Sequence, residues 1–236
     1  MLRRGVVYLL VTVALGPLLH AAPTTYTGSL TSADGGLVGT GGWVNTPGQS
    51  VTFTWTVTEN ADLSWHYHYE FDSTGLQGDL GHILLEVGAG LAAKEILNAA
   101  PALGTDDPRS YPAANGNPSL PDALFAIKFE PFRGPVGIME FDSPAAPAWG
   151  DFYAKGGAKS GHLWNAGFTV SDTDAIAPVQ DGSIDDHVLV PALNDSITAY
   201  DAGSAPLTAP APAPGALLLS SFGAGLLSWL RTRKVF

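Results

Sequence analysis

The chain has 236 residues, enough for one folded domain, and its 28 Gly and 18 Pro against 14% charged residues favour turns and short strands over long helices. All 22 Asp and Glu but only six of the 11 Lys and Arg lie between residues 5 and 230, which gives this interior a net charge of −16. So acidic a surface repels phosphate backbones and argues against nucleic acid as a partner. The chain has no Cys, so its stability must come from burial rather than from disulfides.

The amino-terminal residues have the features of a secretory signal peptide. Arg3 and Arg4 form a positive region, Gly5 to Leu19 is an apolar run, and a small-residue cleavage site ends at Ala21. The apolar run is short for a bilayer span, which needs about 20 residues. We therefore predict that residues 1–21 are removed on export.

Two alternating runs predict a β-hairpin. In residues 51–57 Val, Phe, Trp and Val alternate with Thr, and in residues 63–71 Leu, Trp, Tyr, Tyr and Phe alternate with Ser, His, His and Glu. A period of two predicts strands with one buried and one polar face, and the short polar segment between the runs predicts the turn. Further strands are predicted at 25–30, 36–44, 82–87, 123–130, 136–142, 149–154, 164–171 and 187–190.

The polar face of the first hairpin strand is a row of threonines at positions 52, 54, 56 and 58. Such a row is reminiscent of ice-binding surfaces, but one strand alone makes no array. The high β-propensity of Thr accounts for the row, and we expect no function from it.

The pattern of strands and breakers predicts the fold class. Leu91–Ala99 has good helix formers in a row, ended by Pro101, and predicts one short helix. Residues 101–121 hold five Pro and little periodicity, which predicts a long surface loop. Eight to ten short strands therefore indicate an all-β domain over residues 22–201, specifically a jelly-roll-like β-sandwich, with a closed barrel as the alternative.

A Pro/Ala segment and a second apolar run end the sequence. Residues 202–214 predict an extended linker, because alternating Pro excludes helix. Residues 215–230 are uncharged and would span about 24 Å as a helix, so residues 215–236 predict a transmembrane segment whose basic tail stays cytoplasmic. An amphipathic or buried terminal helix is the alternative. The motif residues of this segment are Pro210, Pro212, Pro214, Arg231, Arg233 and Lys234.

This order of Pro-rich motif, short apolar helix and basic cluster resembles the PEP-CTERM sorting signal of Gram-negative bacteria. Where that family has Pro-Glu-Pro, this chain has Pro210-Ala211-Pro212. The resemblance implies that an exosortase-like enzyme processes the segment. It also implies that the chain is exported, held transiently in the inner membrane, and then released or anchored at the cell surface, often in organisms that make exopolysaccharide.

Three potential metal ligands share the polar face of the second hairpin strand. His66, His68 and Glu70 are spaced by two residues, or about 7 Å per step. On a jelly roll this set is similar to the His and Glu ligands of cupins, although cupins place the Glu further along the chain. One interpretation is a transition-metal site; the other is a polar outer face opposite an aromatic core stripe. The fourth ligand of such a site would come from His82, His162 or His187.

Two further kinds of ligand site are suggested by composition. Oxygen ligands for Ca²⁺ would come from Asp172, Asp174, Asp181, Asp185 and Asp186, and solvated turns are the alternative because no spaced Ca²⁺-loop motif is present. Side chains that would stack on sugar rings are Trp43, Trp149, Tyr153 and Trp164, and core packing is their alternative.

The sequence contains no Gly-x-Ser-x-Gly elbow, phosphate-binding loop, dinucleotide fingerprint or His-Glu-x-x-His motif. The absence of these motifs favours a non-catalytic protein, and the resemblance to the PEP-CTERM signal implies a surface or matrix protein associated with exopolysaccharide. The alternatives are a carbohydrate-binding module and a cupin-like, metal-dependent enzyme.

Overall fold

A computed structural model describes residues 22–44, 47–104, 107–113, 116–157, 161–169 and 181–192. All of them belong to the first of the two units into which the chain divides, Met1–Tyr200. The predicted signal peptide, linker and sorting segment lie outside the described residues. Within the described residues, no helix is both long and apolar enough to cross a membrane.

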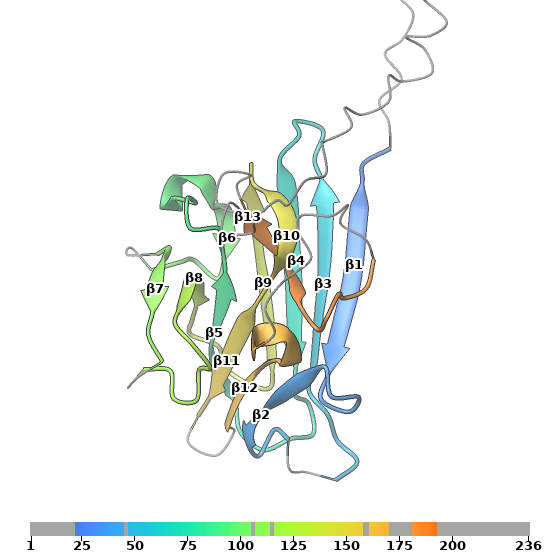
Figure 1. Ribbon diagram of the computed structural model, residues 1–236, viewed down its shortest axis with the longest axis vertical. Coiled ribbons are helices and arrows are strands. Elements are labelled where there is room, and N and C mark those ends of the chain that lie inside the picture. The colour runs from blue at the N-terminus through green and yellow to red at the C-terminus, as the bar shows by residue number, and fades with distance from the viewer. Residues whose placement is uncertain are drawn as a thin grey trace, which may run out of the picture. The chain divides into compact units, whose positions relative to one another are not determined.

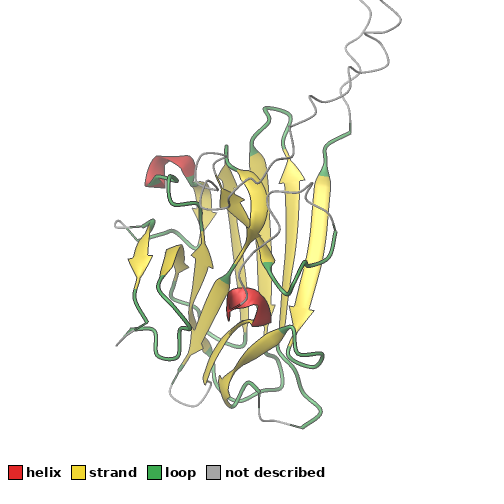
Figure 2. Cartoon of the chain, in the orientation of Figure 1, coloured by secondary structure: helices red, strands yellow, loops and turns green. Residues whose placement is uncertain are grey.

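The described chain is all-β, with only two short 3₁₀ helices (Figures 1 and 2). The elements are β1 Thr25–Thr31, β2 Leu37–Gly41, β3 Thr52–Glu59, β4 Trp65–Asp72, β5 Leu80–Glu86, η1 Ala93–Glu95, β6 Leu97–Ala100, β7 Arg109–Tyr111, β8 Leu124–Phe129, β9 Val136–Ser143, β10 Ala146–Gly150, β11 Phe152–Gly156, β12 Gly161–Asn165, η2 Ala166–Thr169 and β13 Val188–Ala192.

The strands form two large sheets and one small one. Sheet A has the order β1-β3-β4-β9-β6, and sheet B has the order β2-β12-β11-β5-β8-β7. Strands β10 and β13 form a separate pair. Every strand pairing is antiparallel. Two antiparallel sheets that share one core are consistent with a β-sandwich.

The main core lies between the inner faces of the two sheets. Alternation along β3 and β4 sends their aromatic side chains inward, where Phe53, Tyr67, Tyr69 and Phe71 are fully buried. Phe53 of sheet A stacks on Phe152 of sheet B with ring centroids 3.9 Å apart and planes 10° apart. Each such side chain contributes about 1.5–3 kcal/mol by leaving water. The aromatic stripe therefore fixes which face of the hairpin points outward.

Sheet B has a second, smaller apolar cluster on its outer face. Alternation places Leu84 and Tyr153 there, where they pack with Tyr111 of β7, Leu124 of β8 and Leu120 of the segment between those two strands. The Tyr153 hydroxyl donates to the Pro118 carbonyl over 2.7 Å, which ties that segment to the sheet. Part of sheet B is thus covered on both faces.

Most predicted strands are confirmed. The hairpin is formed by β3 and β4, with Thr52 paired to Asp72 and Glu59 to Trp65. Strands β1, β2, β5, β8, β9 and β13 also fall on predicted segments.

Two predicted strands are wrong in extent. The segment 149–154 is two strands, because β10 pairs with β13 while β11 pairs with β5. Between them the Asp151 N–H donates to the Glu86 carboxylate over 2.7 Å. The described part of the segment 164–171 contains the end of β12, followed by η2.

The predicted helix at Leu91–Ala99 is also wrong. Only η1 is helical, and the chain then pairs with β9 as strand β6. Pairing with an available sheet edge outweighs the small helix propensity of this short run. The predicted loop 101–121 contains strand β7 as well, because Tyr111 is buried in the cluster on sheet B.

Candidate functional site

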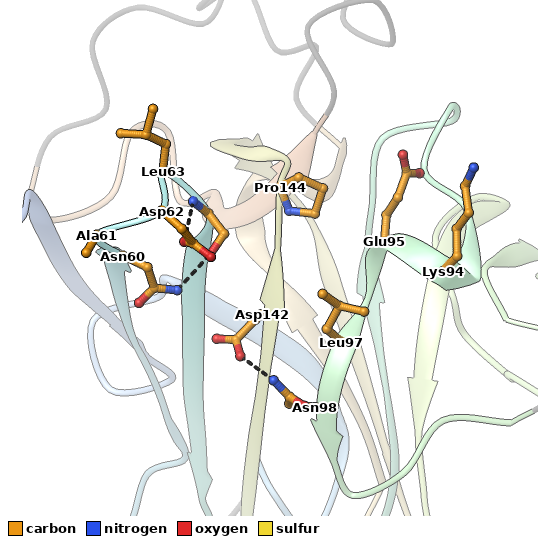
Figure 3. A pocket seen from close by; sticks show the side chains of 11 residues that line it. Asn60, Ala61, Asp62, Leu63, Lys94, Glu95, Leu97, Asn98, Asp142 and Pro144 are labelled. Carbon is orange, nitrogen blue, oxygen red and sulfur yellow. Dashed lines mark hydrogen bonds between the residues drawn. The ribbon is translucent and has the colours of Figure 1, made fainter.

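A groove of about 710 Å³ lies at one end of sheet A, between the β3–β4 turn and the η1–β6 segment (Figure 3). We name it the Asp142 groove. Its lining residues are Asn60, Ala61, Asp62, Leu63, Ser64, Lys94, Glu95, Leu97, Asn98, Asp142 and Pro144. Three separate segments thus meet at this groove, and the sheet register brings them together.

Asp142 is the polar centre of the groove. It lies near the end of β9 and is paired across the sheet with His66 of β4 and, on the other side, with Leu97 of β6. His66 donates from Nδ1 to Asp142 Oδ1 over 2.8 Å. Asn98 donates from Nδ2 to Asp142 Oδ2 over 2.7 Å, a contact visible in Figure 3. Two neighbours therefore hold both oxygens of the carboxylate in place.

These contacts keep Asp142 ionised. Burial acts to raise the pKa of Asp142, but the hydrogen bonds from Asn98 and His66 outweigh it and hold the pKa below its ordinary value. At the rim, hydrogen bonds from the Ser64 hydroxyl and backbone lower the pKa of Asp62 in the same way. The groove thus presents fixed anionic acceptors.

The backbone at the rim is strained, and apolar side chains are exposed there. Leu63 has φ 68° and Asn98 has φ 55°, a left-handed conformation that is uncommon for Leu. Leu63 is 73% exposed and Leu97 is 49% exposed. Leu63 and Leu97 therefore place exposed apolar surface beside the polar centre of the groove.

The Ser64 hydroxyl, which lines the groove, is already hydrogen-bonded. The Ser64 hydroxyl donates to Asp62 over 2.6 Å and accepts from Asn60 over 2.9 Å, so it is engaged away from the Asp142–His66 pair. What remains is a set of oriented donors and acceptors flanked by apolar surface. This combination is typical of sites that recognise small polar ligands.

The predicted metal site at His66, His68 and Glu70 is not formed. His66 is bonded to Asp142, and His68 Nδ1 lies 3.6 Å from Glu140. Within the described residues, no group of three His, Cys, Asp or Glu side chains is placed to hold a metal ion. The strand register places a β9 carboxylate beside each histidine, Asp142 beside His66 and Glu140 beside His68, so the three predicted ligands do not gather around one point.

The three candidate fourth ligands cannot complete that site. His82 and His162 lie on sheet B, where His82 bonds Asn117 over 3.1 Å and His162 lies 3.3 Å from the Thr40 hydroxyl. His187 is buried against Asp151 over 3.0 Å. The polar hairpin face belongs to the outer side of sheet A, so the core separates it from these histidines.

The described part of the predicted Ca²⁺ cluster serves the fold. The Asp181 carboxylate accepts from the Thr27 backbone and hydroxyl over 2.7 and 3.2 Å, which ties the segment before β13 to β1. Asp185 and Asp186 occupy left-handed turn conformations, with φ 47° and 59°. Asp172 and Asp174 lie outside the described residues.

Three of the four predicted sugar-stacking side chains are core residues. Trp43 and Tyr153 have no exposed surface and Trp149 is 9% exposed, so none can present a ring face to a sugar. Large aromatic side chains fill cores because of the area that they bury. Trp164 is only partly buried, on the outer side of sheet B beside the second cluster.

Sequence reasoning missed the residues that build the groove. Asp142 and Asn98 come from predicted strand and helix segments, and only the strand register brings them to His66. Sequence reasoning likewise missed a buried polar network, in which Asp151 accepts from Asn165 over 2.7 Å and from His187. The sequence marks His66 and His187 as potential ligands, but it gives no signal that pairs them with Asp142 and Asp151, which lie far from them along the chain.

The chain matches no protein-family model, and no curated protein or solved structure is significantly similar to it.

Proposed function

We propose that the protein is exported and displayed at the cell surface as a non-catalytic, exopolysaccharide-associated protein. The observation that supports this most is where the strands lie: β1 begins at Thr25 and β13 ends at Ala192. Every described strand therefore falls between the predicted signal peptide and the predicted linker. Removal of either terminal segment, by a signal peptidase or by an exosortase-like enzyme, would leave all the described strands in place.

The finer fold is part of the proposal. We infer a jelly-roll-like β-sandwich, because the chain passes repeatedly from one large sheet to the other. It does so between β1 and β2, β2 and β3, β4 and β5, β5 and β6, β6 and β7, and β8 and β9. The local hairpins β3–β4 and β11–β12 are additions to that pattern.

The Asp142 groove is the proposed contact with glycan. Asp142 and Asn98 offer an acceptor and an amide at fixed positions, as sugar hydroxyls require. Leu63, Leu97 and Pro144 offer apolar surface for the C–H faces of a sugar ring. This assigns the carbohydrate-binding role to a groove of aliphatic and amide side chains rather than to an aromatic platform.

The export proposal is tested by the mass of the mature chain. We expect the full chain, expressed in a Gram-negative host, to lose residues 1–21 and to fractionate with the envelope or the medium. Reversal of the amino-terminal charge in an Arg3→Glu, Arg4→Glu variant should leave unprocessed chain in the cytoplasm. Wild-type chain of unprocessed mass in the cytoplasm would contradict the proposal.

The sorting proposal needs a separate variant. An Arg231→Glu, Arg233→Glu, Lys234→Glu chain should still lose its signal peptide but should lose its defined membrane orientation. A protease-accessibility assay on intact spheroplasts reads this orientation. An unchanged orientation would contradict the assignment of residues 215–236 as a transmembrane sorting segment.

A further inference from the structure

The outer face of sheet A is an ordered array of hydroxyl and acidic side chains. The register aligns outward-facing residues of β1, β3, β4 and β9 in four cross-strand rows: Thr25, Thr58, His66 and Asp142; Thr27, Thr56, His68 and Glu140; Ser29, Thr54, Glu70 and Ile138; and Thr31, Thr52, Asp72 and Val136. The threonine row of β3 therefore does not stand alone, because the outward-facing Thr and Ser side chains of β1 form a second hydroxyl column beside it. The first row continues into the Asp142 groove.

This face is open over much of its extent. Thr25, Thr27 and Ser29 are exposed, and the Thr54 and Thr56 hydroxyls make no hydrogen bond to a described residue. The side chains of His68 and Glu140 are 37% and 46% exposed, and Ile138 is 51% exposed. By contrast, the second apolar cluster covers part of the outer face of sheet B.

Charge is divided unevenly between the two sheets. The five strands of sheet A contain no Lys or Arg, whereas Glu70, Asp72, Glu140 and Asp142 face outward from them. The basic residues found in described strands all belong to sheet B: Arg109, Lys128 and Lys155. The face of sheet A therefore favours a cationic ligand and disfavours an anionic one.

We propose that the outer face of sheet A binds a polycationic, hydroxyl-rich polymer, namely a partly deacetylated amino-sugar polysaccharide. Its ammonium groups would pair with the carboxylates of β4 and β9, and its hydroxyls with the columns of β1 and β3. Strands about 4.8 Å apart offer such contacts at repeated intervals, which suits a repeating chain. This inference rests on the proposed function, because only an exported protein would meet such a polymer.

The polymer itself provides the first test. The full chain, purified in a non-ionic detergent, would be mixed with chitosan, with its acetylated and uncharged parent chitin, and with the carboxylated polymer alginate. We expect co-sedimentation with chitosan that weakens as salt is added, and little with the other two. Equal binding to chitin, or preferential binding to alginate, would overturn the proposal.

Variants locate the contact. A Glu70→Gln, Asp72→Asn, Glu140→Gln chain should bind chitosan about tenfold more weakly, since three ion pairs with the polymer are lost. The matched control is Asp34→Asn, Asp122→Asn, Glu130→Gln, which removes the same charge outside sheet A and should change affinity less than about twofold. Equal weakening in both variants would show an effect of net charge alone and would overturn the assignment to this face.

The hydroxyl column has its own test. A Thr54→Val, Thr56→Val chain keeps side-chain shape and β-propensity but lacks two hydroxyls, so it should stay folded and bind chitosan several-fold more weakly. Unchanged affinity in this variant would overturn the role of the hydroxyls. The binding assay uses purified chain, so its result does not depend on export. A failure to bind chitosan would therefore contradict this inference without contradicting the export proposal, and a failure of export would not alter the binding result.

Discussion

The outer faces of the two large sheets differ in composition and in how far they are covered. On sheet B, Leu84 and Tyr153 are covered by the segment that follows β7, so this face adds a second apolar cluster to the fold. On sheet A, hydroxyls and carboxylates alternate with the core stripe and face solvent. One outer face of this domain therefore adds to its stability, whereas the other remains available for a ligand.

The covered face should be essential for stability. Tyr153→Ala removes a fully buried ring and should lower the free energy of unfolding by about 3–5 kcal/mol. Thr56→Ala on the open face should cost less than about 1 kcal/mol. Urea denaturation of the full chain measures both. Similar costs for the two variants would contradict the division between faces.

His82 should make the covered face sensitive to acid. Burial, with Lys128 nearby, lowers the pKa of His82 to about 4. The folded state thus resists a proton that the unfolded chain accepts below about 6.5, so stability is full above that pH and is lost as pH falls toward 4.

The loss amounts to about 3 kcal/mol at most. His82→Gln keeps a donor for Asn117 but cannot titrate, so the difference in unfolding free energy between wild type and variant should change over this pH range. Denaturation curves at a series of pH values measure it. A difference that stays constant with pH would contradict the role given to His82.

The Asp142 groove should lose its polar centre in an Asp142→Asn chain. The new amide cannot accept from both His66 and Asn98, so we expect a loss of about 1 kcal/mol in stability and a larger loss in glycan affinity. The control variant is Ser110→Ala, because Ser110 is an exposed residue of sheet B, and this change should alter neither stability nor glycan affinity. Glycan affinity equal to that of wild type would remove the groove from the binding surface.

The smallest effect is expected at the hairpin tip. Leu63→Asn places a residue that tolerates the left-handed conformation where an exposed leucine now stands, and should stabilise the fold by up to about 1 kcal/mol. The same change should weaken glycan binding. A gain in stability with unchanged binding would mean that Leu63 has no part in contact.

The fold was more predictable from the sequence than the groove. The period of two in β3 and β4 identified the hairpin and its polar face, because burying Phe53 and Tyr69 leaves the threonines and histidines outside. Leu91–Ala99 was misread because a free sheet edge outweighs weak helix propensity. The signal peptide and the sorting segment stay predictions.

The site was less predictable because it depends on register. The alternation of residues predicts that His66 lies on the polar face of its strand, but it predicts a metal ion as its partner. The observed partner, Asp142, lies 76 residues further along the chain, so only the strand register shows the contact. Trp43, Trp149 and Tyr153 were candidates for stacking because composition cannot separate a buried ring from an exposed one. The second hydroxyl column became apparent only when β1 was seen paired with β3.

The most direct test of the division between faces is carboxylate footprinting of the full chain with and without chitosan. Carbodiimide labelling read by mass spectrometry reports the accessibility of each acidic side chain. We predict that chitosan protects Glu70, Asp72 and Glu140 while Asp122 and Glu130 stay equally reactive. Protection at Asp122 and Glu130 instead, or equal protection at all five, would contradict the account.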